Sequence, residues 1–403
     1  MIDAYSPVAA RAWDGFDQLD AVPADALLGL IGLYRSDDRP DKIDLGVGVF
    51  RNDDGATPVM RAVKSAEAHL LQDQSTKSYL GADGDSRFAE LLAEVALGSD
   101  IARSPRLCGV QTPGGTGALR LGAELLQRAA PDATVWIGEP TWPNHGPIFL
   151  SAGLKVAGHR FYDVAAATID FAAMMEDLEA AMPGDILLLH GCCHNPTGAT
   201  LAPGQWATIA GFCEEKGIIP LIDLAYQGLG DGLDEDAAAT RAMFAALPAA
   251  LLAYSCDKNF GLYRDRVGAL WVQSPRAGTA PLVRGNMFAL ARSLWSMPPD
   301  HGAALVRIIL DSRDLRADWE AELSAMRLRI NGLRETVAAR QPSLAFIGRQ
   351  RGMFAMLPMA PGEVAEMRAR HGIYMAPNGR INIAGLTREN IPHFLASLGQ
   401  VAP

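Results

Sequence analysis

Short apolar runs alternate with longer segments of helical periodicity through the middle of the chain. Runs of this length, bounded by polar and turn residues, are typical of buried strands. The four clearest are Thr134–Gly138, Ile186–His190, Ile218–Asp223 and Leu251–Ser255. The segments between them, which include Pro203–Lys216 and Glu235–Leu247, predict helices. Strand–helix alternation predicts a mostly parallel sheet with helices on both faces.

Residues 1–23 are expected to form an N-terminal arm. On either side of the central region, the pattern predicts further helices and strands. The predicted helices are Ala24–Arg35, Val59–Gln74, Asp85–Leu97, Pro113–Ala129, Gly285–Trp295, Asp311–Arg340, Gly362–His371 and Arg388–Leu398. The predicted strands are Leu107–Thr112, Arg266–Val272, Leu344–Ile347, Met353–Leu357 and Arg380–Ala384. Because short strands and helices mix after the long helix, the tail predicts a second α/β domain.

Polar side chains gather where the four central strands end. Trp142 and His145 follow the first run, Asn195 follows the second, Asp223 ends the third and Lys258 follows the fourth. The C-terminal ends of parallel strands share one edge of the sheet, and open α/β folds bind their ligands there. The sequence therefore predicts a site at this edge.

The stretch from Ser255 to Arg266 indicates the chemistry of that site. Lys258 offers an amine, and Ser255 and Arg266 flank it with a hydroxyl and a bidentate cation that suit a phosphate. Gly115 and Thr116 open a predicted helix, whose free N–H groups form a further anion site. Pyridoxal phosphate carries both an aldehyde and a phosphate and would use all of these groups. Taken alone, Lys258 could also be a solvated lysine at a strand end.

Composition narrows the class of protein. The chain has 403 residues, of which 49% are hydrophobic and 20% charged, as in ordinary globular proteins. Its net charge of -10, with no block of like charge, argues against nucleic acid as a partner. We expect neither a signal peptide nor a membrane span, since neither pattern occurs. Five cysteines, two of them adjacent, favour a reducing compartment, so we expect a cytoplasmic protein.

Motifs spread over nearly the whole chain carry a resemblance to a known family. They are Leu45–Arg51, Gly115–Arg120, Pro140–His145, His194–Gly198, Asp223–Tyr226, Lys258–Tyr263, Arg266, Ser296–Pro299, Gly352–Phe354 and Arg380–Gly385. In this order they resemble the fold type I pyridoxal phosphate aminotransferases of the aspartate and aromatic group, and Leu189–Gly198 is most similar to bacterial aromatic aminotransferases. The resemblance implies an α/β fold with a large cofactor-binding domain (49–311), whose mostly parallel sheet is sandwiched by helices. A smaller α/β domain (1–48 with 312–403) would include the N-terminal arm.

The resemblance implies a role for each residue around the pyridoxal phosphate ring. Lys258 would bond covalently to the cofactor and move the proton between substrate and cofactor. Asp223 would pair with the ring nitrogen, Tyr226 and Asn195 would hydrogen-bond the ring oxygen, and Trp142 would stack on the ring. Taken alone, Asp223 could also cap a helix, Asn195 could belong to a plain turn and Trp142 could be a core aromatic.

The same resemblance implies a phosphate site that two subunits share. Gly115, Thr116, Ser255 and Arg266 would hold the phosphate. Tyr79 would reach the phosphate of the neighbouring subunit, so the active protein would be a homodimer with shared active sites.

Two arginines are expected to bind the amino acid and 2-oxo acid substrates. Arg380 would hold the substrate α-carboxylate through two parallel hydrogen bonds. Arg292 would come from the other subunit and meet the side-chain carboxylate of aspartate, glutamate or 2-oxoglutarate, although a surface charge is the alternative. Gly48 and its neighbours would close over the substrate, and Trp142 and Asn195 would line the same space.

Three histidines and two cysteines lie within the same motifs. His145 is expected behind the aspartate that pairs with the ring nitrogen. A metal site formed by His145, His190 and His194 is the alternative, but no Asp, Glu or Cys set at metal spacing accompanies them, and we expect no metal. Cys192 and Cys193 are expected to be packing residues.

Four positions depart from the pattern of the family. Gly114 stands where many relatives have Ser, which removes a phosphate hydroxyl, and Asp257 places an acid directly before the lysine. Phe50 replaces a common Tyr. Met297 replaces the Asn of aspartate-specialised members, and a more apolar wall would favour an aromatic side chain.

The resemblance and the departures together predict an aromatic-amino-acid transaminase. We expect it to move the amino group of phenylalanine, tyrosine or tryptophan, and also of aspartate, to 2-oxoglutarate by a ping-pong mechanism. An aspartate-specific aminotransferase is the alternative. Arg292 argues against a pyridoxal phosphate lyase or decarboxylase. The combination of Lys258, Asp223 and Arg380 argues against a non-catalytic binding protein.

Overall fold

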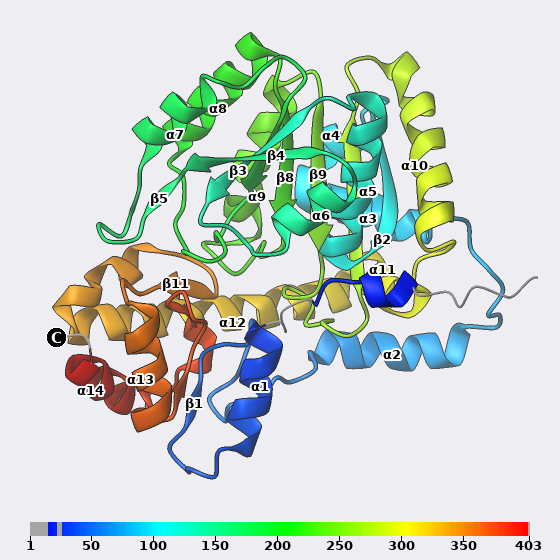
Figure 1. Ribbon diagram of the computed structural model, residues 1–403. Helices are drawn as coiled ribbons and strands as arrows, with labels where there is room; N and C mark the ends of the chain where they lie inside the picture. Colours follow the sequence, from blue (N-terminus) through cyan, green and yellow to red (C-terminus); the bar gives the residue numbers. More distant parts are fainter. Residues whose placement is uncertain (1–14, 22–25, 402–403) are drawn as a thin grey trace, which may run out of the picture.

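A seven-stranded sheet forms the centre of the computed structural model, which describes residues 15–21 and 26–401 (Figure 1). In spatial order the strands are β2 (Leu107–Pro113), β10 (Val267–Gln273), β9 (Ala250–Ser255), β8 (Ile219–Leu224), β7 (Ile186–His190), β3 (Thr134–Glu139) and β4 (Lys155–Arg160). Strand β10 runs antiparallel to both of its neighbours, and the other pairs in this sheet are parallel. The predicted mostly parallel sheet is confirmed, and the four apolar runs are its strands β3, β7, β8 and β9.

Successive side chains of the central strands point into two different cores. Leu221 and Leu251 pack in the core formed with α5, α6 and α10, whereas Ile222 and Leu252 pack in the core formed with α3, α8 and α9. These helices are α5 (Gly114–Ala129), α6 (His145–Ser151), α10 (Ala280–Leu294), α3 (Ser86–Leu97), α8 (Pro203–Lys216) and α9 (Leu233–Ala246). Both faces of the sheet are therefore covered, which is why its strands are apolar at consecutive positions.

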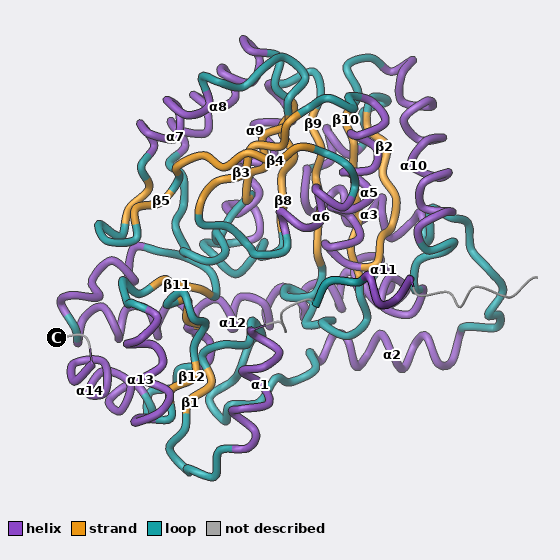
Figure 2. The backbone as a smooth tube through the Cα atoms, viewed as in Figure 1, coloured by secondary structure: helices purple, strands orange, loops and turns teal. Residues whose placement is uncertain are grey.

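A smaller unit of short strands and helices lies beside the large sheet (Figure 2). It contains two pairs of strands: β1 (Ile43–Asp44) is parallel to β12 (Ile373–Tyr374), and β11 (Phe354–Met356) is antiparallel to β13 (Arg380–Asn382). Its helices are α1 (Ala26–Ser36), α13 (Pro361–His371) and α14 (Ile391–Val401). The exact domain boundaries stay a prediction, and the expected arm over residues 1–23 lies mostly outside the described residues.

Further elements lie outside the strands and helices given above. They are η1 (Gly15–Gln18), α2 (Arg61–Asp73), α4 (Ser99–Ala102), β5 (Tyr162–Asp163), β6 (Thr168–Ile169), α7 (Phe171–Leu178), η2 (Ala277–Thr279), α11 (Asp300–Asp311), α12 (Arg313–Arg340), η3 (Pro342–Arg349) and η4 (Ile383–Gly385). The long helix α12 packs against η3 in the smaller unit and against α2 and α11 beside the large sheet. Among the described helices, none has the length and apolar character that crossing a membrane requires.

The predicted strand Leu344–Ile347 is wrong, because these residues belong to the 3₁₀-helix η3. Pro342 starts this helix, and a three-residue repeat places Leu344 and Ile347 on one buried face. A short apolar run with this spacing fits a strand as well as it fits a 3₁₀-helix. The long predicted helix is confirmed as α12, but it begins after Ser312, whose hydroxyl caps the backbone N–H of Leu315.

A buried arginine on α12 holds the smaller unit together. The guanidinium of Arg334 is 1% exposed and donates to the backbone carbonyls of Ile347, Gly352 and Phe354, among others. Burial lowers the pKa of Arg334 to about 9. The loop after β7 packs on the same backbone, since a Cβ on Gly198 would lie 2.3 Å from the Phe354 carbonyl oxygen. Arg334 therefore fixes β11 against the loop that leaves the large sheet.

We expect Arg334→Leu to lower the free energy of unfolding by roughly 3 kcal/mol or more, because several buried carbonyls lose their donor. Urea unfolding followed by circular dichroism measures this change. Arg313→Leu, on the same helix, is the matched control because the side chain of Arg313 is 98% exposed. Equal stability of the two variants would contradict the assigned role of Arg334.

Candidate active site

A cavity of ≈ 230 Å³ lies at the C-terminal ends of β7, β8 and β9 and at the start of α5. Its lining residues are Gly115, Thr116, Leu119, Trp142, His190, Asn195, Asp223, Ala225, Tyr226, Ser255, Asp257, Lys258 and Arg266. The cavity brings together every residue predicted to bind the cofactor except Tyr79. It lies at the sheet edge where the strand-end rule predicts a site.

Lys258 lies on a firmly held turn directly after β9. The Asn259 side chain donates to Tyr254 Oη at 2.8 Å, and the Asn259 carbonyl accepts from Trp319 Nε1 at 2.8 Å. The ring of Phe260 stacks on Trp319 with centroids 4.3 Å apart. All four of these side chains are fully buried, so the turn holds Lys258 at the cavity wall.

A chain of hydrogen bonds leads from the cavity floor to the loop after β7. His145 Nε2 lies 3.0 Å from Asp223 Oδ2, and His145 Nδ1 lies 2.7 Å from Thr141 Oγ1. The same hydroxyl lies 3.2 Å from His190 Nε2, and the backbone N–H of Asn195 donates to His190 Nδ1 at 3.5 Å. Two residues that line the cavity, Asp223 and Asn195, are therefore connected behind it.

One placement of protons satisfies this whole chain. The backbone N–H of Asn195 can only donate, so His190 accepts on Nδ1 and carries its proton on Nε2. That N–H donates to the hydroxyl of Thr141, whose own proton is donated to His145 Nδ1. His145 therefore carries its proton on Nε2 and donates to Asp223. A neutral imidazole thus holds the carboxylate of Asp223 in its ionised form.

The pKa values agree with this assignment. Burial lowers the pKa of His190 to about 3, and burial holds the pKa of His194 well below its usual value. For Asp223, burial has the largest single effect and would raise the pKa, but the hydrogen bond from His145 and nearby positive charge, including that of Lys258, together outweigh burial, so the pKa lies below its usual value. These histidines are therefore neutral, and Asp223 is ionised, near neutral pH.

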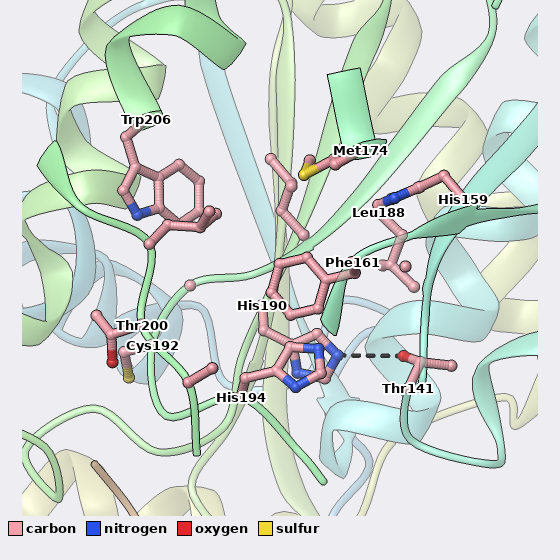
Figure 3. Close-up of a pocket in the computed structure, with 15 residues that line it drawn as sticks. Thr141, His159, Phe161, Met174, Leu188, His190, Cys192, His194, Thr200 and Trp206 are labelled. Carbon is pink, nitrogen blue, oxygen red and sulfur yellow. Dashed lines mark hydrogen bonds between the residues drawn. The ribbon is translucent and has the colours of Figure 1, made fainter. Parts of the chain in front are cut away.

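A water-sized cavity of ≈ 30 Å³ lies behind these histidines (Figure 3). The rings of His190 and His194 lie against each other with centroids 4.1 Å apart, and the ring of Phe161 covers His194 at 4.5 Å. His190 points toward Thr141, and His194 bonds the hydroxyl of Thr197 at 2.9 Å. The two histidines form a packed and hydrogen-bonded wall behind the main cavity.

Within residues 15–21 and 26–401, three potential metal ligands converge at Cys192, Cys193 and Asp236 rather than at the histidines. The Asp236 carboxylate already accepts three backbone N–H groups of the 228–231 loop, each at 2.8 Å. Cys193 is buried and Cys192 is half-buried. The expected packing role of the two cysteines stays a prediction.

The start of α5 and the residues opposite it form a cradle for an anion. Gly115 and Thr116 lie in the first turn of the helix, whose N–H groups have no intrahelical partner. A Cβ on Gly115 would lie 3.0 Å from Ser255 Cβ, so glycine keeps the space between them open. Arg266 closes the cradle and donates through Nη1 to Asp257 Oδ2 at 2.7 Å.

The groups around the cavity fit pyridoxal phosphate. Lys258 supplies an amine for the aldehyde, and the ionised Asp223 suits a protonated ring nitrogen. Trp142 offers an aromatic face beside them. Ser255 and Arg266, with the first turn of α5, supply the donors that a phosphate needs.

Arg380 lies next to this cavity, on β13 of the smaller unit. Its guanidinium is buried, with Nη1 3.3 Å from Asn195 Oδ1 and Nη2 3.0 Å from the Gly46 carbonyl oxygen. The guanidinium lies 4.5 Å from the centroid of the Phe354 ring, and a Cβ on Gly48 would lie 2.8 Å from that ring. Burial lowers the pKa of Arg380, and Nε has no hydrogen-bond partner among the residues that the structure describes. The guanidinium is therefore a buried cation next to the cavity, in contact with Asn195 from the cavity wall.

Tyr79 and Arg292 do not line the cavity of this chain. Tyr79 is 93% exposed, and the Arg292 guanidinium donates to Ser296 Oγ on the exposed end of α10. The N–H of Leu80 bonds the sulfur of Met297 at 3.1 Å, so these two segments lie on one surface. Both residues are thus placed where a second chain could receive them.

The sequence reasoning missed three residues that organise the site. Thr141 stands four positions before His145, a spacing that could have been noticed within the Pro140–His145 motif. Phe354 also belongs to the Gly352–Phe354 motif. Its ring contacts Arg380, however, and that contact joins two separate segments of the chain. Arg334 stands four residues after Ile330, so helical spacing places this arginine on the apolar face of the predicted helix. An arginine at such a position is the signal that could have identified it.

Comparison with known proteins places the chain among aminotransferases. Residues 40–398 match the family described as "Aminotransferase class I and II". The chain is 51% identical to the tyrosine aminotransferase of Rhizobium meliloti (strain 1021), over 92% of this chain and 96% of the relative. It is 46% identical to the aromatic-amino-acid aminotransferase of Paracoccus denitrificans, over 91% of this chain and 95% of the relative. The aspartate aminotransferase of Escherichia coli (strain K12) is 43% identical, over 93% and 97% respectively.

Solved structures agree with these sequence matches. An aromatic amino acid aminotransferase with 3-indolebutyric acid has a TM-score of 0.93 and 45% identity, and the match covers 96% of this chain and 100% of that one. The aromatic-amino-acid aminotransferase of Burkholderia pseudomallei, covalently bound to pyridoxal phosphate, has a TM-score of 0.93 and 36% identity, covering 96% and 99%. The expected fold is confirmed.

The half-buried His190 predicts a loss of stability in acid. The pKa of His190 is near 3 in the folded chain and 6.5 in its ordinary state, so the unfolded chain binds more protons between these values. Stability should fall as pH decreases below 6.5, by about 2 kcal/mol from His190 alone on reaching pH 5. Urea unfolding at a series of pH values measures the slope. His190→Gln should reduce the slope, whereas the exposed control His69→Gln should leave it unchanged; equal slopes in all three proteins would refute this assignment.

Proposed function

This chain belongs to the class I and II aminotransferase family, and we propose that it moves the amino group of aromatic amino acids, and of aspartate as a further donor, to 2-oxoglutarate. It is a pyridoxal-phosphate-dependent transaminase. When bound, the cofactor takes up the amino group and holds the electrons left when the substrate loses its α-proton. The observation that carries the proposal is the meeting of Lys258, Asp223 and Arg380 around one cavity edge.

Lys258 is proposed to hold the cofactor covalently and then to carry the proton on and off the substrate carbon. Its side chain is 19% exposed, and Nζ lies 5.6 Å from the centroid of the Tyr226 ring. A lysine on a fixed turn can return to the same point after each transfer. This placement supports a base that acts at one atom of the substrate.

Asp223 is proposed to keep a proton on the ring nitrogen of the cofactor. The neutral His145 donates to this carboxylate, and the pKa of Asp223 lies below its usual value mainly through that bond, despite burial. An ionised carboxylate in a buried place stabilises a cation beside it. The hydrogen-bond chain through Thr141 and His190 supports this charge state from behind.

Three side chains are proposed to position the ring. Trp142 would stack on one face, and Asn195 and Tyr226 would bond the ring oxygen. Burial, reinforced by the charge of Asp223, raises the pKa of Tyr226 far above its usual value, so this hydroxyl stays protonated and can donate. Gly115, Thr116, Ser255 and Arg266 are proposed to hold the phosphate, as their shared cradle supports.

Arg380 is proposed to bind the α-carboxylate that all substrates share. Its buried guanidinium touches Asn195, and within the described part of the chain its Nε has no hydrogen-bond partner; a buried cation of this kind supports a role in binding an anion. Gly48 and its neighbours are proposed to close over the substrate. Arg292 of a second subunit is proposed to meet the side-chain carboxylate of dicarboxylic substrates, and Met297 to supply the apolar contact that aromatic side chains need.

A homodimer follows from these proposals. Tyr79 and Arg292 are exposed, and their segments share a surface, which supports donation of both residues to a neighbouring site. We also propose the domain division into 49–311 and 1–48 with 312–403. A cytoplasmic location is supported by the five cysteines, all within the described residues and all free thiols.

An aspartate-specific aminotransferase is the second candidate. The 43% identity to the E. coli aspartate aminotransferase favours it, and so does an exposed Arg292 suited to dicarboxylates. The aromatic proposal is preferred because two aromatic or tyrosine aminotransferases show higher identity, 51% and 46%.

Titration of the purified holoenzyme with amino acids tests the function. The visible band of the lysine-bound cofactor should bleach with phenylalanine and, separately, with aspartate, because both donate their amino group. Lys258→Ala should lack this band and lose about 10²–10⁴-fold or more in kcat. Bleaching by aspartate alone would favour the second candidate. Absence of a band after pyridoxal phosphate is added would refute the role of Lys258.

Mixing two inactive variants tests the shared site. Lys258→Ala lacks the amine, and Arg292→Ala should lose activity with aspartate. If Arg292 acts on the neighbouring site, mixed dimers have one intact site, and random exchange restores about a quarter of the wild-type activity. The same mixture of Lys258→Ala with Arg380→Ala is the control, because one mixed site then lacks Lys258 and the other lacks Arg380. No recovery with Arg292→Ala would show that Arg292 does not cross between subunits.

A further inference from the structure

An acidic residue lies inside the proposed phosphate cradle. Asp257 is 5% exposed and lines the cavity with Ser255 and Arg266. Its Oδ2 lies 2.7 Å from Arg266 Nη1 and 3.7 Å from Lys258 Nζ. Its Oδ1 is buried and has no hydrogen-bond partner within residues 15–21 and 26–401. A carboxylate at this point adds a negative charge where the cofactor would bring another.

Gly114 makes room for the same ion pair. It has φ +72°, and a Cβ there would lie 2.6 Å from Arg266 Nη2 and 3.1 Å from Arg266 Cζ. The guanidinium, in the position where it binds Asp257, therefore occupies the space that a side chain at position 114 would need. The small residue at 114 and the acid at 257 are the two expected departures from the family pattern, and both meet at the guanidinium of Arg266.

The ion pair competes with the phosphate for the same donors. Arg266 Nη1 donates to Asp257 and also to the Tyr263 carbonyl at 3.1 Å, so this nitrogen is already engaged. A phosphate that takes both ends of the guanidinium must share or displace the carboxylate. The carboxylate also repels the phosphate oxygens at short range in a partly buried place.

We propose that Asp257 weakens the hold on the cofactor phosphate, so that the covalent bond to Lys258 supplies most of the retention of the cofactor. The cofactor then exchanges readily whenever that bond is open, which occurs in the aminated half of each catalytic cycle. The inference rests on the proposed cofactor role of this cavity. It differs from the opposite reading, in which Asp257 orients Arg266 and thereby strengthens phosphate binding.

Binding of pyridoxamine 5′-phosphate to the cofactor-free full chain, measured by equilibrium dialysis, tests the proposal. This probe has no aldehyde and cannot bond to Lys258, so its affinity reports the non-covalent site. Asp257→Asn should bind the probe roughly tenfold more tightly, since one repelling charge and one competitor for Arg266 are removed. Inorganic phosphate, added as a competitor of the probe, should likewise bind more tightly to Asp257→Asn than to the wild type. Unchanged or weaker binding by Asp257→Asn would overturn the proposal.

Two controls keep the result specific. Asp265→Asn removes an acid directly before Arg266 but outside the cavity lining, and its affinity for the probe should stay near that of the wild type. Thermal unfolding of each variant checks that the fold is intact. If the wild-type chain binds no probe and has no transaminase activity, the proposed function itself fails; normal activity without tighter binding by Asp257→Asn refutes this inference alone.

A double-mutant cycle with Gly114→Ser gives an independent measurement. In the wild-type background this substitution should weaken probe binding, because the added side chain meets the guanidinium of Arg266. In the Asp257→Asn background Arg266 can move, so Gly114→Ser should be tolerated or should improve binding. The strain at φ +72° is common to both backgrounds and cancels in the cycle. Additive effects of the two substitutions would contradict the coupling of positions 114 and 257.

Discussion

The buried hydrogen bond from His145 Nε2 to Asp223 Oδ2, 3.0 Å long, is the constraint on which the site depends. Burial alone would raise the pKa of this carboxyl group and favour its neutral form, and a neutral acid could not hold a protonated ring nitrogen. The hydrogen bonds that Thr141 makes with His145 and His190 determine which nitrogen of His145 carries the proton. The charge of Asp223 is thus set by the hydrogen-bond chain behind it.

The second requirement is that two structural units meet at one point. The strand ends of the large sheet supply the amine, the acid and the anion cradle, whereas Arg380 comes from a short strand of the smaller unit. Arg334 binds the carbonyl of Phe354, and the ring of Phe354 covers the guanidinium of Arg380. A buried cation far along the chain therefore helps to place the cation that is proposed to bind substrate.

Local pattern was enough to predict the sheet and the residues along its edge. The strands are buried on both faces, so their sequences are continuously apolar, and the polar residue after each strand lies at the same edge. The side chains of Lys258, Asp223 and Asn195 could be assigned to one cavity for this reason. The resemblance to a family, rather than the pattern itself, supplied their individual roles.

Other features could not be read from local sequence. The hydrogen bonds of Arg334 reach carbonyls 13–20 residues further along the chain. Their contribution to stability comes from burial, which residue spacing does not reveal. The 3₁₀-helix at Leu344–Ile347 was missed because a short apolar run satisfies two periodicities. The predicted roles of Tyr79 and Arg292 require a second chain.

The bond between Arg380 and the Gly46 carbonyl has a consequence for how substrates are distinguished. The guanidinium that is proposed to bind the substrate carboxylate also donates a hydrogen bond to the segment at Gly46–Gly48. Binding of a carboxylate and ordering of that segment are therefore linked by one coupling free energy. This energy is common to every amino acid and 2-oxo acid, because all of them carry the same α-carboxylate. Changes in the stiffness of the segment therefore raise or lower all affinities in parallel. The ratio between an aromatic and an acidic substrate is left to groups that touch the substrate side chain.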